Sequence, residues 1–191
     1  MFNLVIFGAP GSGKGTQSER IIDKYGLVHI STGDVLRKEI AAGTELGKIA
    51  DSYISHGHLI PDDLMVRILA DVIDRSGNDV KGFIFDGFPR TIKQAEELEK
   101  MLEKRGEKLH SVIGLEVPDD ELTDRLIERG KISGRADDNP ETISERLKVY
   151  HSTTSPLRDF YVTKGTYRPI HGSGKIDDIF ADIVSAIEAA H

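Results

Sequence analysis

Several features are missing from this chain, and each absence excludes a class of protein. The 191 residues contain no cysteine, which excludes disulfides and thiolate metal sites and is typical of a reducing compartment. No apolar run approaches the roughly 20 residues that a membrane-spanning helix needs. A formal net charge of −7 argues against a general nucleic-acid binder, which carries a basic face. The first strand-like run begins at Phe2, so we expect no signal peptide and a cytoplasmic protein.

Short apolar runs alternate with longer amphipathic ones, a pattern typical of strands and helices in a parallel sheet. We predict five strands, at Asn3–Phe7, Val28–Ile30, Lys81–Phe85, His110–Glu116 and Tyr167–His171. We predict the helices that follow them at Lys14–Tyr25, Pro61–Ser76, Thr91–Arg105, Asp119–Arg129, Glu141–Lys164 and Asp177–Ala190. The sequence therefore predicts one α/β domain over residues 1–191, with a five-stranded, parallel, doubly wound sheet.

Residues 31–60 depart from this alternation. They contain two short predicted helices, Asp34–Ala42 and Glu45–His56, with no strand between them. We expect this stretch to form a helical subdomain inserted over the edge of the sheet.

A glycine-rich turn follows the first strand directly. Backbone amides of such a turn point toward phosphate oxygens, the N-terminus of the next helix adds partial positive charge, and Lys14 can reach the outer phosphates. The turn departs from the P-loop consensus at Gly15, where a serine or threonine normally binds Mg²⁺. We predict an ATP-phosphate site of the P-loop NTPase type, formed by Gly11, Ser12, Gly13, Lys14, Gly15 and Thr16.

The acid that ends the third predicted strand favours a kinase over other P-loop proteins. Asp86 is followed by Gly87 and not by the glutamate that activates water in many ATPases, and the guanine-reading motif N-K-x-D is absent. We predict that Asp86 orients hydrated Mg²⁺ through water and that an organic phosphate is the acceptor.

Arginines occupy positions that structure alone would not favour. Arg129 and Arg146 each fall on the apolar face of a predicted helix, where a guanidinium must reach solvent or find an anion. The planar fork of arginine binds phosphate in a bidentate way and stays charged. With Arg37, Arg90 and Arg135, these two arginines are therefore predicted to form a phosphate clamp.

Four motifs together resemble the adenylate kinase family. They are residues 8–17, residues 31–37 (S-T-G-D-V-L-R), residues 86–91 (D-G-F-P-R-T) and residues 133–139 (S-G-R-A-D-D-N). The match runs from the first strand to the last helix, and the family also carries glycine at the position of Gly15. The resemblance implies reversible, Mg²⁺-dependent phosphoryl transfer from ATP to AMP that gives two ADP, within nucleotide biosynthesis.

The resemblance also implies roles for individual residues. Arg129 and Gly174 would join the glycine-rich turn at ATP, with Gly174 against the purine. The implied AMP contacts are Thr32, Arg37, His58, Leu59, Ile60, Gly87, Phe88, Pro89, Arg90, Gln94, Arg135 and Arg146. The implied catalytic residues are Lys14, Arg90, Arg129, Arg135 and Arg146. Residues 31–60 would bind the monophosphate, and residues 129–137 would form a lid.

Only Gly130–Gly134 separates Arg129 from Arg135, whereas many bacterial members carry a longer lid there, often with a cysteine-bound zinc. The chain is therefore similar to the short-lid form. This form implies a monomer without structural zinc, whose partners are ATP, AMP and ADP and neither nucleic acid nor membrane. We expect the short loop to close over the phosphates and exclude water.

Two alternatives remain open at this point. A UMP/CMP kinase shares the fold and the short lid, but Thr32, Thr91 and Gln94 favour AMP, because a glutamine amide can pair with the adenine edge. A non-catalytic adenine nucleotide sensor would be expected to have lost Lys14 or a clamp arginine, and none is missing.

Overall fold

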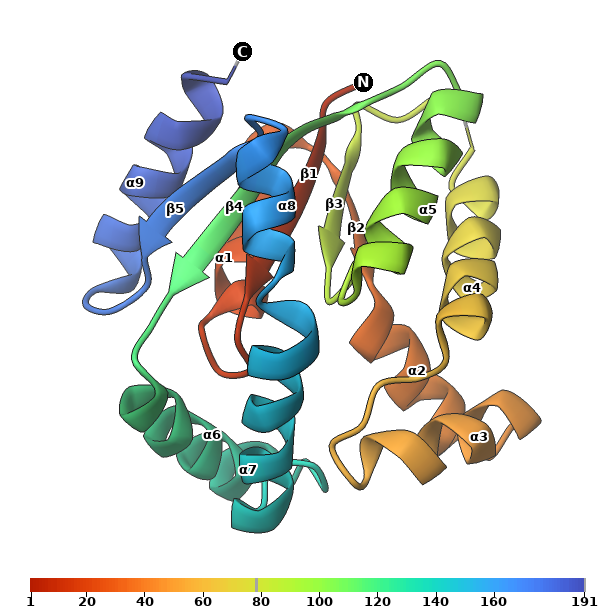
Figure 1. The fold of residues 1–191 in the computed structure, drawn as a ribbon, viewed down its shortest axis with the longest axis vertical. Coiled ribbons are helices and arrows are strands. Elements are labelled where there is room, and N and C mark those ends of the chain that lie inside the picture. Colours follow the sequence, from red (N-terminus) through yellow and green to blue (C-terminus); the bar gives the residue numbers. More distant parts are fainter. Residues whose placement is uncertain (78, 191) are drawn as a thin grey trace.

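Five parallel strands form one sheet in the computed structural model, which describes residues 1–77 and 79–190 (Figure 1). Their order across the sheet is β2-β3-β1-β4-β5. The strands are β1 (Asn3–Gly8), β2 (Val28–Ser31), β3 (Phe83–Asp86), β4 (Leu109–Glu116) and β5 (Tyr167–His171). The predicted five-stranded, parallel α/β sheet is confirmed.

Helices cover both faces of this sheet. Side chains alternate between the two faces along each strand, so both faces carry apolar side chains that the helices bury. Leu4 and Ile6 of β1 pack in the cluster that contains the apolar faces of α1 (Lys14–Tyr25) and α9 (Ile176–Glu188). Val5 and Phe7 pack in the opposite cluster. That cluster contains residues of α4 (Asp62–Arg75), α5 (Ile92–Lys104) and α8 (Leu157–Thr163).

Two helix pairs lie beyond the carboxyl ends of the strands, on opposite sides (Figure 1). One pair is α2 (Thr32–Ala41) and α3 (Glu45–Ile54), which together match the two helices predicted in residues 31–60. The other pair is α6 (Asp119–Ser133) and α7 (Pro140–Val149). The turn that follows β1 lies between the two pairs, so ligands at the strand ends are flanked from both sides.

Two predicted helix boundaries are wrong. The helix predicted to end at Arg129 continues to Ser133 and ends at Gly134, whose φ of 66° lies in the left-handed region. The single helix predicted over Glu141–Lys164 is interrupted after Val149 by a π-helical turn, in which the Ser155 amide donates to the Tyr150 carbonyl at 2.7 Å. Pro156 has no amide hydrogen to continue the helix, and α8 begins after it.

The other predicted boundaries lie within two residues of the observed ones.

Within the described parts of the chain, none of the helices has both the length and the apolar composition to span a bilayer.

Asn3 ties the start of β1 to both neighbouring strands. Its fully buried side chain donates from Nδ2 to the Glu107 carboxylate at 2.9 Å and to the Lys108 carbonyl at 3.1 Å. Its Oδ1 accepts the Phe83 amide at 3.0 Å. These bonds join β1 to β3 and to the segment that precedes β4.

Replacing Asn3 with leucine should lower the free energy of unfolding by about 2–3 kcal/mol, because buried polar groups lose their partners. Urea unfolding measures this change, with Ser52→Leu on the exposed face of α3 as the control for an added apolar side chain. Equal unfolding midpoints for Asn3→Leu and the unmodified protein would contradict the claim that the hydrogen bonds of Asn3 stabilise the sheet.

Candidate active site

Two cavities adjoin at the carboxyl ends of β1 and β3. The first, here called the P-loop cavity, extends from the turn after β1 to residues 172–179. The second, called the α2 cavity, lies between α2 and the segment 57–60. Seven residues line both cavities: Pro10, Lys14, Gly33, Arg37, Gly87, Arg90 and Arg146. Four of them are cationic, so an anion at the junction of the cavities is surrounded by positive charge.

The P-loop is shaped by the way in which α1 begins. Gly13 precedes α1 with a φ of 95°, a left-handed conformation that other residues rarely adopt. The first turn of α1 contains no acidic side chain, so the positive end of the helix dipole is unopposed. All six predicted loop residues, Gly11 to Thr16, line the P-loop cavity.

Lys14 lies in this loop, and none of the carboxylates that the structure describes forms an ion pair with it. Its Nζ donates to the carbonyls of Gly8 and Ala9, at 2.9 and 3.0 Å. The pKa of Lys14 is lowered to about 7, mainly because burial desolvates its charge; Asp86 opposes this shift, and the charges of nearby arginines contribute to it. A phosphate beside Lys14 would supply the missing negative charge and raise this pKa.

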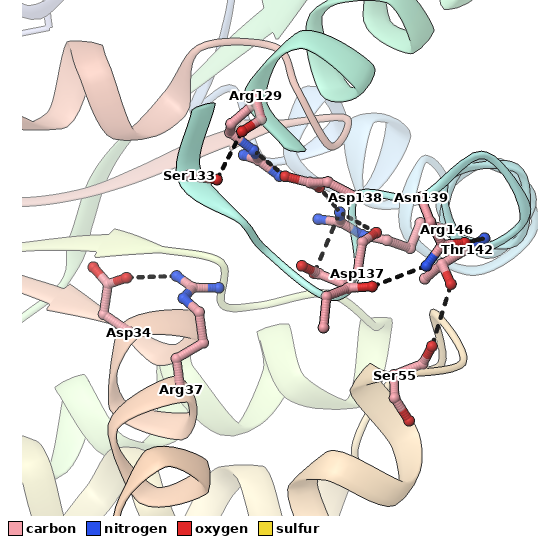
Figure 2. Close-up of polar contacts among 11 residues, drawn as sticks. Asp34, Arg37, Ser55, Arg129, Ser133, Asp137, Asp138, Asn139, Thr142 and Arg146 are labelled. Atoms are coloured by element: carbon pink, nitrogen blue, oxygen red, sulfur yellow. Dashed lines mark hydrogen bonds and ion pairs between the residues drawn. The ribbon is translucent and has the colours of Figure 1, made fainter. Parts of the chain in front are cut away.

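A buried carboxylate holds two of the predicted clamp arginines together (Figure 2). Asp138 accepts two hydrogen bonds from Arg129 on α6, at 2.6 and 2.7 Å, and a third from Arg146 on α7, at 2.8 Å. The Asp138 side chain is 0% exposed, and Arg146 also lies 3.3 Å from the Asp137 carboxylate. Burial alone would raise the pKa of Asp138, but the hydrogen bond from Arg129 and the charges of three arginines hold it below its usual value.

A second arrangement positions Arg90. Its Nε donates to the Gly87 carbonyl at 2.9 Å, and the Thr32 hydroxyl donates to the same oxygen at 3.0 Å. Gly87 has a φ of 81°, and an added Cβ would lie 3.0 Å from the Thr32 hydroxyl, so only glycine fits. Burial, and then the charge of Arg146, lowers the pKa of Arg90 to about 10, which leaves it cationic at neutral pH.

Gln94 lies beside Arg90, and its amide orientation is fixed. Its Oε1 accepts the Arg90 amide at 2.8 Å, and its Nε2 donates to Asp62 at 2.9 Å. The residue is 2% exposed and lines the α2 cavity. One N–H and one lone pair of the amide remain for a ligand, because each amide atom can form two hydrogen bonds.

Most of the other predicted residues also line one of the two cavities. His58, Leu59, Ile60 and Pro89 line the α2 cavity, whereas Arg129, Arg135 and Gly174 line the P-loop cavity. Phe88 is different: it is 1% exposed, packs in the same core cluster as Ile60 and does not line either of the two cavities. Its role as an AMP contact stays a prediction.

Asp86 fits the role of an outer-sphere Mg²⁺ ligand. Its side chain is 13% exposed, lines the P-loop cavity, and lies 3.3 Å from Nε2 of His29. Mg²⁺ is typically bound by one or two carboxylates, by substrate phosphates and by several retained waters. A single carboxylate beside a phosphate site supplies the protein's share of such a set.

Comparison with known proteins agrees with this geometry. The family model described as adenylate kinase matches residues 6–166. An adenylate kinase of Bacteroides thetaiotaomicron is 65% identical over 188 residues, which cover 98% of this chain and 99% of the relative. Those of Phocaeicola vulgatus and Porphyromonas gingivalis are 62% and 52% identical, over 98% of this chain and 99% and 96% of the relatives.

The chain belongs to the adenylate kinase family. Its predicted family, its P-loop α/β fold and its predicted activity as an ATP:AMP phosphotransferase are thereby confirmed. The alternatives of a UMP/CMP kinase and of a nucleotide sensor are not favoured by matches of this length and identity.

Sequence reasoning missed three residues of this adenylate kinase site. Arg125 lines the P-loop cavity and donates to the Gly172 carbonyl at 3.0 Å; its position one helical turn before Arg129 could have indicated it. Asp137 and Asp138 belong to the motif of residues 133–139, but the sequence predicts no separate role for them. Their pairing with Arg129 and Arg146 spans a helix end, where sequence periodicity carries no information.

Replacing Lys14 with methionine should abolish phosphoryl transfer and stabilise the fold. The Lys14 pKa is about 7 in the folded chain against an ordinary 10.5, so below pH 7 the folded state bears the full cost of a desolvated charge. This cost disappears as the pH rises toward 10.5. We expect a gain on the order of 1–3 kcal/mol at pH 7, reduced by the loss of two hydrogen bonds.

Urea unfolding at pH 7 and pH 10 measures this gain, which should shrink at the higher pH. Lys24→Met, an exposed change on the same helix, is the control. A Lys14→Met protein that is less stable at both pH values would contradict the proposed cost of the buried charge.

Replacing Asp138 with asparagine should lower kcat by about 10- to 100-fold, because the charge that orients Arg129 and Arg146 is removed. Steady-state kinetics with ATP and AMP measures the effect. Asp119→Asn, which alters an exposed pair with His151, is the matched control and should leave kcat unchanged. A folded Asp138→Asn enzyme with normal kcat would show that the carboxylate does not organise the clamp.

Proposed function

We propose that ATP binds in the P-loop cavity and AMP in the α2 cavity, so that the phosphoryl group crosses the wall that the two cavities share. The observation that carries this proposal is the set of four cationic side chains, Lys14, Arg37, Arg90 and Arg146, that line both cavities. A group in transit between two nucleotides must lie at such a junction. The same four charges can then stabilise it throughout the transfer.

The proposed step is a direct in-line displacement. A phosphate oxygen of AMP forms a bond to the γ-phosphorus of ATP, while the bond from that phosphorus to the β–γ bridging oxygen breaks. The electron pair of the broken bond remains on the β-phosphate, so both products are ADP, and no side chain has to accept a proton. The protein's contribution is therefore position and charge rather than acid–base chemistry.

Individual roles follow from where each side chain lies. We assign the amides of Gly11–Thr16 and Lys14 to the β- and γ-phosphates, and Arg90 and Arg37 to the phosphate of AMP. Arg129, Arg135 and Arg146 stabilise the transferring group. Arg135 makes no side-chain hydrogen bond or ion pair within residues 1–77 and 79–190, which leaves its guanidinium for phosphate oxygens.

The acceptor base is assigned to the α2 cavity. Gln94 presents one free N–H and one free lone pair there, and Asp62 and the Arg90 amide fix which atom is the donor. This pattern suits adenine, whose edge offers one donor and one acceptor. Thr32 and the backbone of residues 58–60 complete the enclosure of AMP.

Residues 31–60 act as the monophosphate-binding subdomain in this proposal, and residues 129–137 act as the lid. Because α6 continues to Ser133, the part of the lid that is not helical is limited to residues 134–137. Closure of this segment over the phosphates would exclude water, which competes with AMP as acceptor. The short-lid resemblance supports a monomer, and the absence of cysteine supports the cytoplasm.

Product formation from ATP with each of AMP, CMP, UMP and GMP tests the proposed function. We expect rapid ADP formation with AMP and turnover lower by at least about 100-fold with the others, because a mismatched base leaves buried polar groups unpaired. Equal activity with CMP or UMP would contradict the assignment of Gln94. Absence of turnover with all four would contradict the proposal itself.

Mg²⁺ would be held by the ATP phosphates and by Asp86 through water, and when bound it neutralises charge on the transferring group. Asp86→Asn should therefore raise the Mg²⁺ concentration needed for half-maximal activity by about tenfold. Titration of activity with Mg²⁺ at fixed ATP measures this change, with Asp63→Asn on exposed α4 as the control. An unaltered Mg²⁺ dependence would contradict the assignment of Asp86 to Mg²⁺ and would indicate that its role is purely structural.

A further inference from the structure

The turn between β5 and α9 is rich in glycine, which restrains the backbone less than other residues do. It comprises residues 172–174, Gly-Ser-Gly, and is here called the donor turn; Gly174 has a φ of 109°. Both glycines line the far end of the P-loop cavity, next to the apolar side chains of Ile176 and Ile179. The resemblance to adenylate kinases implies that Gly174 lies against the purine of ATP, so with ATP in the P-loop cavity this end would receive the base. A glycine-rich turn can select a base only if contacts from other elements fix its conformation.

Two helices hold the donor turn from opposite sides. From α6, the Glu121 carboxylate accepts the Ser173 hydroxyl at 2.6 Å and binds Arg125 at 2.5 Å. Arg125 in turn donates to the Gly172 carbonyl at 3.0 Å. From α1, Nε2 of Gln17 donates to the Ile176 carbonyl, two residues after the turn, at 3.2 Å. The turn is therefore fixed to the helix that starts at the P-loop and to the helix that carries Arg129.

Gln17 is the more informative of these contacts. The residue is 2% exposed, and its Oε1 is buried without a hydrogen-bond partner among the described residues. Reversing the amide would place Oε1 against the Ile176 carbonyl, so the contact itself fixes the orientation. A buried unpaired acceptor opposes folding, and an apolar side chain of the same shape would avoid it. Stability alone therefore does not account for glutamine at this position.

We propose that Gln17 and Glu121 are positioning residues that fix the donor turn, and that they thereby set the affinity and the base selectivity for the phosphate donor. This inference rests on the proposed function, which places ATP in the P-loop cavity. Gln17 follows Thr16 at the phosphate end of that cavity and reaches the base end. It therefore sets the distance between the phosphate site and the base site, a dimension that a purine nucleotide must match.

The test uses Gln17→Met, which keeps the side-chain length and removes both the donor and the unpaired acceptor. We expect the KM for ATP to rise about three- to tenfold, the range of one lost hydrogen bond, and the preference for ATP over GTP to fall by a similar factor. The KM for AMP should remain unchanged, because the α2 cavity is intact. The thermal unfolding midpoint should stay equal or rise. A role in stability alone would instead lower the midpoint and leave the KM for ATP unaltered.

Ser173→Ala, Glu121→Ala and their double variant test the opposite side of the turn with less risk to folding. If both residues act through their one hydrogen bond, the rise in the KM for ATP in the double variant will be smaller than the product of the single effects. Lys24→Met on α1 is the control and should alter neither KM. An unchanged KM for ATP in both Gln17→Met and Ser173→Ala, or equal rises for ATP and AMP, would overturn the proposal.

Calorimetric titration of each variant with ATP separates this inference from the proposed function. Failure of the unmodified protein to form ADP would reject the proposed function alone, since ATP affinity is still measured. Normal ATP affinity in the variants of an active enzyme would reject the positioning role alone.

Discussion

The site depends on holding several positive side chains close together before any phosphate arrives. Burial lowers the pKa values of Lys14, Arg90 and Arg146, and the charges of neighbouring arginines lower them further. Such a cluster is stable only if buried carboxylates compensate it, and Asp138 does so for two arginines at once. The positive charge that these carboxylates do not compensate attracts phosphate to the site. The clustered cations therefore lower the stability of the folded chain, but they are already in place to stabilise the charge of a transferring phosphoryl group.

The architecture explains why these charges converge. The P-loop and Asp86 come from the carboxyl ends of neighbouring strands, where Ile6 and Asp86 are in register. The arginines come from α2, α6, α7 and the segment after β3, which lie on opposite sides of the same strand ends (Figure 1). Two cavities share this point, so one set of charges can serve both nucleotides. We propose that the donor turn and Gln17 position the base of ATP at the other end of the P-loop cavity.

Much of this arrangement could be predicted from the sequence, because apolar runs and motif spacing are local signals. The five strands, the P-loop and the separate arginines were all predicted, since each depends on a short run of residues. The pairing of Asp138 with Arg129 and Arg146 and the contact of Gln17 with Ile176 could not be, because they join residues brought together only by packing. The break before α8 was missed because the amphipathic pattern continues through the π-helical turn at Tyr150–Thr154. The burial of the Phe88 side chain could not be predicted either, because its motif carries no signal that separates a core residue from a ligand contact.

The most direct test of the shared junction is calorimetric binding of a bisubstrate analogue in which two adenosines are joined through a chain of phosphates. If one set of cations serves both cavities, one analogue should bind per chain, at least about 100-fold more tightly than ATP or AMP alone, and should displace both. An analogue that binds no more tightly than ATP, and leaves AMP binding unchanged, would contradict the account, because the two cavities would then be independent sites.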